Sequence, residues 1–362
     1  MKTQKLSAAA FIGVSGKDII SFGSGQPDLA PPKRVYKALS QCKDFKYGLI
    51  QGEVKLRKAL ARQYPKSTAD NFVITNGASE ALDLTLRVLS KIDSKKKNKV
   101  LLPRPYYYSY PFLVRYAGMR PIYTNLVDGR IDFDDFKKKV KECKAVIINS
   151  PSNPTGRVES MEILKKIEKL TNDLGTYVLS DEVYKDLIYV RENYLIKGPH
   201  VITINSFSKT YAMCGLRIGY LWSLDKKLVE KIIEMKTHTS MNTSILSQEI
   251  AYEAARSSRS FIDKQLKIWE ERRDFIYEGL LKIGLDLWKP EGAFYVMPKI
   301  KNSVDFVWNM FKKYKVITYP GEWFGVKDRV RFSYALDTKK IKEGLFRVKK
   351  YLSKEGRSHI VR

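Results

Sequence analysis

The stretch VITINSFSKTYAMCGLRIGY, residues 201–220, decides the fold. Its first five residues form an apolar run, which predicts a buried strand. The polar SFSK follows at once, and Arg217 stands eight residues after Lys209. Because charge is costly in an apolar interior, two cations directly after a buried strand indicate that they face a charged ligand rather than the core.

Similar apolar runs alternate with helical patterns along the chain. The predicted strands are residues 71–75, 100–103, 119–126, 145–150, 176–181, 201–206 and 219–222. Amphipathic helices are predicted between them at residues 80–92, 132–143 and 161–175. This alternation is typical of an α/β domain with a mostly parallel central sheet, here seven-stranded, that is flanked by helices.

The pattern changes after residue 245. A long charged helix is predicted from about Ser257 to Leu281, and short strands at 293–298 and 329–336 precede a closing helix at 338–354. These elements predict a second, smaller α+β domain, which the non-helical N-terminal segment would join. We therefore expect residues 1–32 and 256–362 to form the small domain with its connecting helix, and residues 33–255 to form the large domain.

Composition excludes several classes of protein. The 66 basic and 39 acidic residues give a net charge of +27, which would suit a nucleic-acid-binding protein. The lysines are scattered without interleaved aromatic residues, however, so a solvated surface explains them and we expect no nucleic-acid partner. Three isolated histidines and three widely spaced cysteines predict no metal site and no disulfide framework. No apolar run reaches the length of a membrane span, so we expect a cytoplasmic protein without a membrane partner.

Polar residues gather after the predicted strands, at the edge where α/β sheets bind ligands. They are Ser79, Asn153, Asp181, Tyr184, Ser206, Ser208, Lys209 and Arg217. A buried lysine can form a Schiff base, and hydroxyl groups, an arginine and a helix N-terminus suit a phosphate. An aspartate can keep a pyridine nitrogen protonated, and an asparagine and a tyrosine can bond a phenolate oxygen. Pyridoxal phosphate presents all of these groups at once.

The chain resembles the class I and II pyridoxal-phosphate-dependent aminotransferases of fold type I. Residues 206–219 look like the family's pyridoxal-lysine signature. Further family marks are GQPD at 25–28, YGLIQG at 47–52, TNGASEAL at 75–82, NPTG at 153–156 and the Asp-x-x-Tyr of 181–184. The resemblance runs from about Ser21 to Leu336. It implies transfer of an amino group from an amino acid to a 2-oxo acid by a ping-pong route.

The resemblance also implies a role for each residue. Lys209 would carry the cofactor as an aldimine and shuttle the substrate α-proton, while Asp181 would face the pyridine nitrogen. Asn153 and Tyr184 would bond the phenolate oxygen. The other implied contacts are those of the phosphate with Ala78, Ser79, Ser206, Ser208 and Arg217, of the cofactor ring with Tyr107, and of the substrate with Arg331, Asn153 and Gly25. Tyr47 would reach the phosphate of a neighbouring subunit, in a homodimer with shared active sites.

Several alternatives stay open at this point. Asp181 and Glu182 could be helix N-caps, Tyr107 competes with its tyrosine neighbours, and Arg331 competes with Arg329. A β-lyase or a decarboxylase would use the same lysine and aspartate. Cys214 is expected to affect packing only.

The expected pocket offers the aromatic residues Tyr47, Tyr107 and Phe11, but no evident second arginine for a dicarboxylate. We therefore favour aromatic or other apolar amino acids as donors, with 2-oxoglutarate as acceptor.

Overall fold

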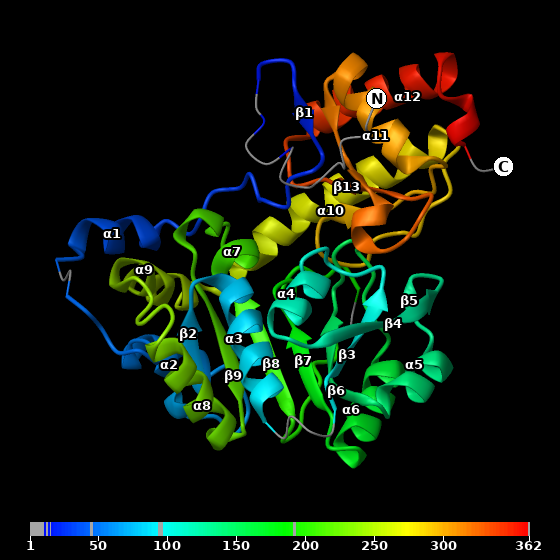
Figure 1. Ribbon diagram of the computed structural model, residues 1–362. Helices are drawn as coiled ribbons and strands as arrows, with labels where there is room; N and C mark the ends of the chain where they lie inside the picture. Colours follow the sequence, from blue (N-terminus) through cyan, green and yellow to red (C-terminus); the bar gives the residue numbers. More distant parts are fainter. Residues whose placement is uncertain are drawn as a thin grey trace.

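A computed structural model describes Phe11, Val14 and residues 16–43, 46–92, 97–190 and 193–360. Its centre is an eight-stranded sheet (Figure 1). In sheet order the strands are β2 (Phe72–Thr75), β9 (Gly219–Ser223), β8 (Val201–Ser206), β7 (Tyr177–Asp181), β6 (Cys143–Asn149), β3 (Lys99–Arg104), β4 (Arg120–Val127) and β5 (Arg130–Ile131). The seven predicted strands are confirmed. The eighth, β5, is a two-residue strand that the sequence did not indicate.

The sheet is mostly parallel, as predicted. Strands β4, β3, β6, β7 and β8 pair in parallel, whereas β9 is antiparallel to both β2 and β8 and β5 is antiparallel to β4. Strands β6, β7 and β8 therefore end at the same edge, where Asn149, Asp181 and Ser206 are their last residues. This geometry brings the polar residues that follow these strands together.

Helices cover both faces of this sheet (Figure 1). Ala145 and Ile147 of β6 pack with α3 (Gly77–Lys91), α4 (Tyr110–Tyr116) and α8 (Lys226–Thr237). Their neighbours Val146 and Ile148 pack with α5 (Phe133–Val140) and α6 (Met161–Asp173). Burial on both faces explains why these strands are continuous apolar runs. At the β2 edge, α1 (Arg34–Gln41), α2 (Val54–Ala61) and α9 (Ile245–Ala255) form a further core.

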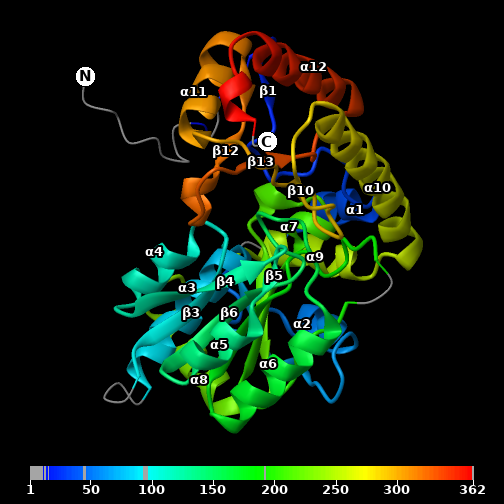
Figure 2. The same cartoon turned by 90° about the vertical axis from the view of Figure 1, so that its right-hand side faces the viewer.

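The C-terminal residues build a second core with part of the N-terminal segment. The helix α10 (Arg259–Lys282) leads to β10 (Tyr295–Val296), α11 (Ser303–Tyr314), β11 (Val316–Ile317), β12 (Tyr319–Pro320), β13 (Val330–Ser333) and α12 (Thr338–Lys354). Strands β10, β13 and β12 form an antiparallel sheet, and β1 (Ile20–Ser21) pairs in parallel with β11. Figure 2 shows β1, α11 and α12 together at the end opposite α8.

The pairing of β1 with β11 agrees with the predicted small domain, while the boundaries at residues 32 and 255 stay predictions.

The remaining elements are the one-turn helix α7 (Phe207–Thr210) and the 3₁₀ turns at Ala69–Asn71, Cys214–Leu216, Gly321–Phe324 and Arg357–His359. Across the part of the chain that the structure describes, no helix is both long and apolar enough to cross a bilayer.

Candidate active site

The main cavity has a volume of about 630 Å³. It lies between the strand ends of the eight-stranded sheet, called the large sheet below, and the three-stranded sheet of β10, β13 and β12, called the small sheet. The predicted site residues that line it are Gly25, Ala78, Ser79, Tyr107, Asn153, Asp181, Tyr184, Ser206, Ser208, Lys209, Arg217 and Arg331. They come from positions up to 306 residues apart in the chain, Gly25 and Arg331 being the extremes. Every residue to which the sequence assigned a cofactor, substrate or catalytic role therefore borders one cavity, with the exception of Tyr47.

Lys209 reaches the cavity from the one-turn helix α7, which begins directly after β8. Ser206 caps this helix, since its Oγ accepts the Ser208 N–H at 3.1 Å. The Lys209 Nζ donates to the backbone oxygen of Gly25 at 2.7 Å. A Cβ added at Gly25 would lie 2.1 Å from the Tyr295 hydroxyl oxygen, so only glycine fits beside the lysine without displacing that ring.

Asp181 is a buried carboxylate at the end of β7. Its Oδ2 accepts the Tyr110 hydroxyl at 2.6 Å, and its Oδ1 accepts the Val183 N–H at 3.3 Å. Burial raises the pKa of Asp181 from 3.8 to about 6, although both hydrogen bonds and the charge of Lys209 oppose the rise. A cation placed beside this carboxylate would favour its ionised form.

Glu182 differs from its neighbour. Its Oε1 accepts the hydroxyl groups of Ser180 and Thr203, and it is absent from the residues that line the main cavity. Burial raises the pKa of Glu182 to about 7. The hydrogen bond from the Val183 N–H to Asp181 is of the kind that a helix N-cap makes. Asp181 nevertheless also borders the main cavity, which Glu182 does not.

The start of α3 and the Arg217 loop form a cluster of hydrogen-bond donors. Gly77 has a φ of +75°, and a Cβ added there would lie 2.5 Å from Arg217 Nη2. A Cβ added at Gly219 would lie 2.8 Å from the Ala78 nitrogen. The Ser206 and Ser208 hydroxyl oxygens are 2.8 Å apart on the same wall. A helix N-terminus, a guanidinium group and two hydroxyl groups fit a phosphate.

Arg331 is almost completely buried, with 2% of its surface exposed. Its Nη1 donates to Asn153 Oδ1 at 2.9 Å and its Nη2 donates to the Gly23 oxygen. Three aromatic rings surround the guanidinium carbon at 4.6 to 4.9 Å, namely Tyr295, Tyr319 and Phe324. The Nε is buried without a hydrogen-bond partner among the described residues. A planar cation held this way suits a carboxylate ligand.

Arg329 points elsewhere, which separates the two arginine candidates. Its guanidinium carbon lies 3.6 Å from the centre of the Trp288 ring, and its Nη1 donates to the Met297 oxygen. It does not border the main cavity.

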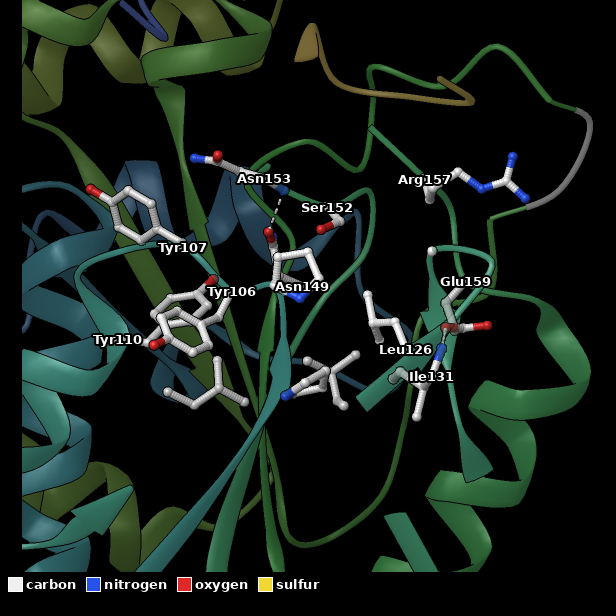
Figure 3. A pocket seen from close by; sticks show the side chains of 15 residues that line it. Tyr106, Tyr107, Tyr110, Leu126, Ile131, Asn149, Ser152, Asn153, Arg157 and Glu159 are labelled. Atoms are coloured by element: carbon white, nitrogen blue, oxygen red, sulfur yellow. Dashed lines mark hydrogen bonds between the residues drawn. The ribbon is translucent and has the colours of Figure 1, made fainter. Parts of the chain in front are cut away.

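Among the neighbouring tyrosines, Tyr107, Tyr108 and Tyr110 line the main cavity, whereas Tyr106 does not. Tyr106 borders a smaller void behind the loop of Asn149 and Asn153, where Figure 3 shows the Asn153 N–H bonded to Asn149 Oδ1. That void has a volume of about 40 Å³, so it has room for little more than water.

Two tyrosines that hydrogen-bond predicted site residues were missed by sequence reasoning. Tyr110 bonds Asp181, and Tyr295 shares a 2.8 Å hydrogen bond with the Tyr184 hydroxyl. Sequence reasoning placed Tyr295 only in a predicted strand, and no local spacing connects it with residue 184. Tyr110 lies three residues after Tyr107, which was the one available signal.

Three other expectations need correction or qualification. Phe11 lies in the core between α11 and β12, against Phe311 and Tyr319, and does not border the main cavity. Cys214, expected to affect packing only, lines that cavity, and its Sγ donates to the Ser208 oxygen at 3.1 Å. Tyr47 is 82% exposed and borders a separate cavity of about 530 Å³, so it does not belong to the main cavity of its own chain.

Comparison with known proteins gives a consistent picture. Residues 17–348 match the family described as aminotransferase class I and II. The sequence is 34% identical to a probable aspartate/prephenate aminotransferase of Aquifex aeolicus, over 93% of this chain and 92% of the relative. It is 32% identical to aromatic-amino-acid aminotransferase 2 of Thermococcus litoralis, over 95% of this chain and 93% of the relative.

Solved structures agree with the sequence relatives. An aspartate aminotransferase from Thermotoga maritima superposes with a TM-score of 0.88 at 29% identity, over 96% of this chain and 95% of that one. An aromatic aminotransferase from Pyrococcus horikoshii superposes with a TM-score of 0.87 at 30% identity, over 96% of this chain and 99% of that one.

Proposed function

The chain belongs to the aminotransferase class I and II family, and from that premise we propose that it transfers the amino group of an amino acid to a 2-oxo acid with pyridoxal phosphate as cofactor. The observation that carries the proposal is the convergence of Lys209, Asp181, Arg217 and Arg331 on one cavity. Each of these side chains matches a different group of the cofactor or substrate. A nucleic-acid-binding function has only the net charge in its favour.

The donors and acceptors of the cavity fit the cofactor. Asp181 would hold the proton of the ring nitrogen, and Asn153 and Tyr184 would bond the phenolate oxygen. Tyr107 would lie against the ring. The phosphate would be bound by Ala78, Ser79, Ser206, Ser208 and Arg217. Once bound near Lys209, the cofactor supplies an aldehyde that combines with amines and a ring that withdraws electrons from the substrate Cα.

The protein's own groups then orient the substrate and move its protons. Arg331 would bind the α-carboxylate, for which it has donors besides those that contact Asn153 Oδ1 and the Gly23 oxygen, among them the unpartnered Nε. The Lys209 Nζ would leave the Gly25 oxygen, remove the proton from the substrate Cα and deliver a proton to the carbon on the cofactor side of the substrate nitrogen. The buried walls keep these groups in place, so most of the protein's contribution is orientation and electrostatics. The same residues would serve the second half-reaction, in which an oxo acid takes up the amino group.

The cavity favours donors without a second negative charge. Within the described residues, its lining contains three cationic side chains, and the roles above use all three. The rest of the wall toward the small sheet is aromatic, with Tyr108, Tyr295 and Tyr319. From this we infer aromatic or other apolar amino acids as donors. The proposed acceptor is 2-oxoglutarate, whose second carboxylate would bind to neutral donors of the same wall. A β-lyase or decarboxylase activity would use the same lysine and aspartate, but the relatives named above are aminotransferases.

We further propose that the enzyme is a cytoplasmic homodimer with shared sites. Tyr47 is 82% exposed, and Leu49 beside it is 51% exposed, as residues that a second subunit covers would be. In this arrangement Tyr47 would reach the phosphate of the partner's site, so that two-fold symmetry completes both sites at once.

A labelling experiment tests the function. The purified protein should be yellow, and borohydride reduction followed by peptide mapping should place the pyridoxyl group on Lys209. Lys209→Ala should abolish amino transfer, whereas Lys226→Ala, a change at an exposed position on α8, should leave label and activity intact. A pyridoxyl label on any other lysine would overturn the assignment. A panel of amino donors, assayed for oxo-acid formation, decides the substrate class.

A further inference from the structure

The first turn of α3 carries a carboxylate next to the proposed phosphate subsite. Ala78 and Ser79 line the main cavity, and Glu80 is the next residue. A negative side chain in the first turn stabilises a helix, but it also repels an anionic ligand at the same helix end. A helix that binds phosphate here therefore needs a group that compensates Glu80.

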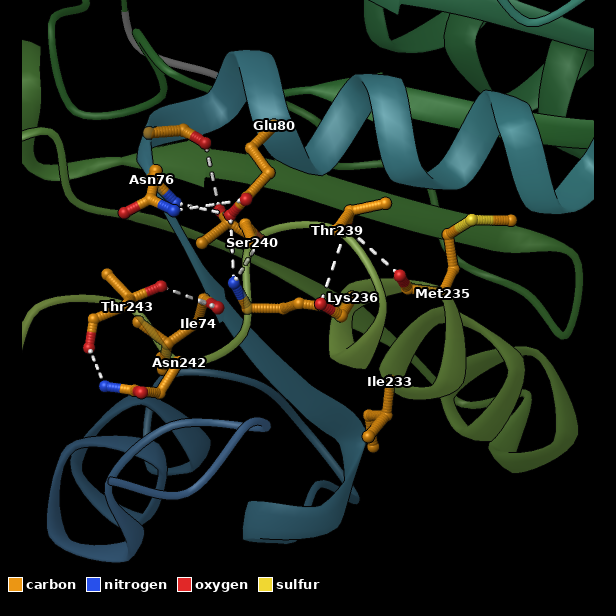
Figure 4. Close-up of polar contacts among 12 residues, drawn as sticks. Ile74, Asn76, Glu80, Ile233, Met235, Lys236, Thr239, Ser240, Asn242 and Thr243 are labelled. Carbon is orange, nitrogen blue, oxygen red and sulfur yellow. Dashed lines mark hydrogen bonds and ion pairs between the residues drawn. The ribbon is translucent and has the colours of Figure 1, made fainter. Parts of the chain in front are cut away.

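The Glu80 carboxylate is held by two hydrogen bonds and an ion pair, and Figure 4 shows the groups that make them. Its Oε2 accepts the Asn76 N–H at 2.7 Å, and its Oε1 accepts the Asn76 Nδ2 at 3.1 Å. The Lys236 Nζ lies 3.2 Å from the same Oε2 and 3.0 Å from the Ser240 hydroxyl. Glu80 thus holds Asn76, the residue before Gly77, in place, and it also pairs with Lys236 of α8.

The lysine of this pair is unusual because its side chain has no exposed surface, compared with 15% for the Glu80 side chain. Burial by itself raises the pKa of Glu80, but hydrogen bonds from Ser240 and Asn76 and the charge of Lys236 outweigh it, so the pKa lies below its ordinary value. Burial lowers the pKa of Lys236, and Glu80 opposes that effect. Over the described residues, Lys236 is the one cation within ion-pairing distance of Glu80.

The backbone holds Lys236 in this position. It lies in the last turn of α8, and its carbonyl oxygen accepts the N–H groups of Thr239, Ser240 and Met241 at 2.9 to 3.2 Å. The following loop is attached to β2 as well, because the Thr243 hydroxyl donates to the Ile74 oxygen at 3.2 Å. Strand β2 leads directly into the turn before α3. Two contacts therefore connect the end of α8 and its following loop with this turn, namely Lys236 with Glu80 and Thr243 with Ile74.

We propose that Lys236 is a positioning residue of the phosphate subsite, where it neutralises Glu80 so that Arg217 and the first turn of α3 present their positive charge to the phosphate. Arg217 has no carboxylate partner among the described residues; its Nη1 donates to the Cys214 oxygen at 3.0 Å. The two cations then have different partners. Lys236 compensates the carboxylate of the protein, and Arg217 stays available for the ligand.

This inference rests on the proposed function, and a binding experiment separates the two. Dissociation constants of full-length protein are measured by absorbance for pyridoxal phosphate and for pyridoxal, which has no phosphate. Lys236→Met leaves Glu80 without its cation, so the affinity for pyridoxal phosphate should fall about tenfold or more while that for pyridoxal stays the same. Glu80→Gln keeps an acceptor for the Asn76 N–H and removes the negative charge, so it should not weaken the phosphate form selectively.

Further variants make the outcome unambiguous. The double variant Glu80→Gln/Lys236→Met should regain most of the affinity for pyridoxal phosphate, and Lys226→Met, an exposed position on the same helix, should change nothing. Equal weakening of both ligands by Lys236→Met would overturn the proposal, since it would show a structural role only. If Lys236→Met does not fold, Glu80→Gln still decides, because a selective loss of the phosphate form in that variant contradicts the charge argument. A wild-type protein that binds neither ligand at Lys209 would instead overturn the proposed function.

Discussion

Removal of the hydroxyl group that contacts Asp181 should change the pH dependence of the enzyme. Tyr110 is 2% exposed and stands at the start of α4, and its hydroxyl lies 2.6 Å from Asp181 Oδ2. Phenylalanine would keep the ring and its packing against Tyr107, whose ring centre is 5.4 Å away. The Tyr110→Phe variant therefore isolates one hydrogen bond to the carboxylate.

The size of the effect follows from that bond. A hydrogen bond to a charged group contributes about 1.5 to 3 kcal/mol, and about 1.4 kcal/mol corresponds to one pKa unit. The Tyr110 bond opposes the rise that burial causes in the pKa of Asp181, which stands at about 6. Without it the pKa of Asp181 should rise by about one unit or more. In the role proposed for Asp181, the ionised carboxylate holds the proton of the ring nitrogen, so the acidic limb of kcat/KM should move to higher pH.

The assay is kcat/KM for one amino donor between about pH 4.5 and pH 9. Because the protonated ring beside Asp181 favours the ionised carboxylate, the acidic limb of the cofactor-loaded enzyme should lie below about pH 6. A one-unit shift then predicts a loss that approaches about tenfold on the acidic side of the limb and little loss at pH 8. Tyr106→Phe is the matched control, since Tyr106 stacks on Tyr123 and does not line the main cavity. A loss of equal size at every pH would refute the reasoning, because it would mean that Tyr110 only shapes the cavity wall.

Two further predictions concern stability and assembly. Burial raises the pKa of Glu182 from 4.5 to about 7, so its contribution to stability is complete below pH 4.5 and is lost as the pH rises through about 7. The loss amounts to ~3 kcal/mol, and the midpoint of thermal unfolding of Glu182→Gln should depend less on pH between about 5 and 8; parallel curves would contradict this. Mixed dimers of Tyr47→Ala and Lys209→Ala chains should regain activity, because one hybrid site has both residues, whereas Arg217→Ala mixed with Lys209→Ala should not. Hybrids verified by mass spectrometry that show no gain would rule out a role of Tyr47 across the interface.

The strands and helices of the large sheet could be predicted because their signals are local. Residues 201–206 begin with the run VITI, and the structure places β8 at those residues, all six of which are buried. The closing helix at 338–354 is confirmed at both ends. By contrast, the predicted strand at 293–298 shrinks to Tyr295–Val296. Ala293 adopts a positive φ of +53°, which no strand residue has, and side-chain pattern does not reveal such a turn.

The site could be predicted where a residue follows a strand, and not where the contact joins distant segments. Asp181 and Ser206 end β7 and β8, so the topology alone brings them to one edge. Arg329 and Arg331 are two residues apart, and alternation in a strand places such residues on the same face. The structure distinguishes them because β13 begins at Val330, which leaves Arg329 outside the strand. The Glu80–Lys236 pair spans 156 residues, a separation at which the sequence pattern carries no signal.

The three cations of the cavity share one property that fits them for exchange with ligands. Lys209 donates to the Gly25 oxygen, Arg331 to the Gly23 oxygen and to Asn153, and Arg217 to the Cys214 oxygen. Among the described residues none of the three is paired with a carboxylate, although the protein has many such pairs elsewhere. Neutral acceptors hold a cation less strongly than a carboxylate does, so an anionic ligand can displace them at lower cost.

Two of these neutral acceptors belong to one short segment, which connects substrate binding with the N-terminal part of the chain. The segment is fastened a few residues later, where Arg272 of α10 contacts both carboxylate oxygens of Asp28 at 2.6 and 3.1 Å. A carboxylate that draws Arg331 away from Gly23 and an aldehyde that takes up Lys209 would both release this segment. The backbone at 23–25 therefore holds the two cations in place before their ligands bind, and the contact of Asp28 with Arg272 keeps that backbone near the cavity afterwards.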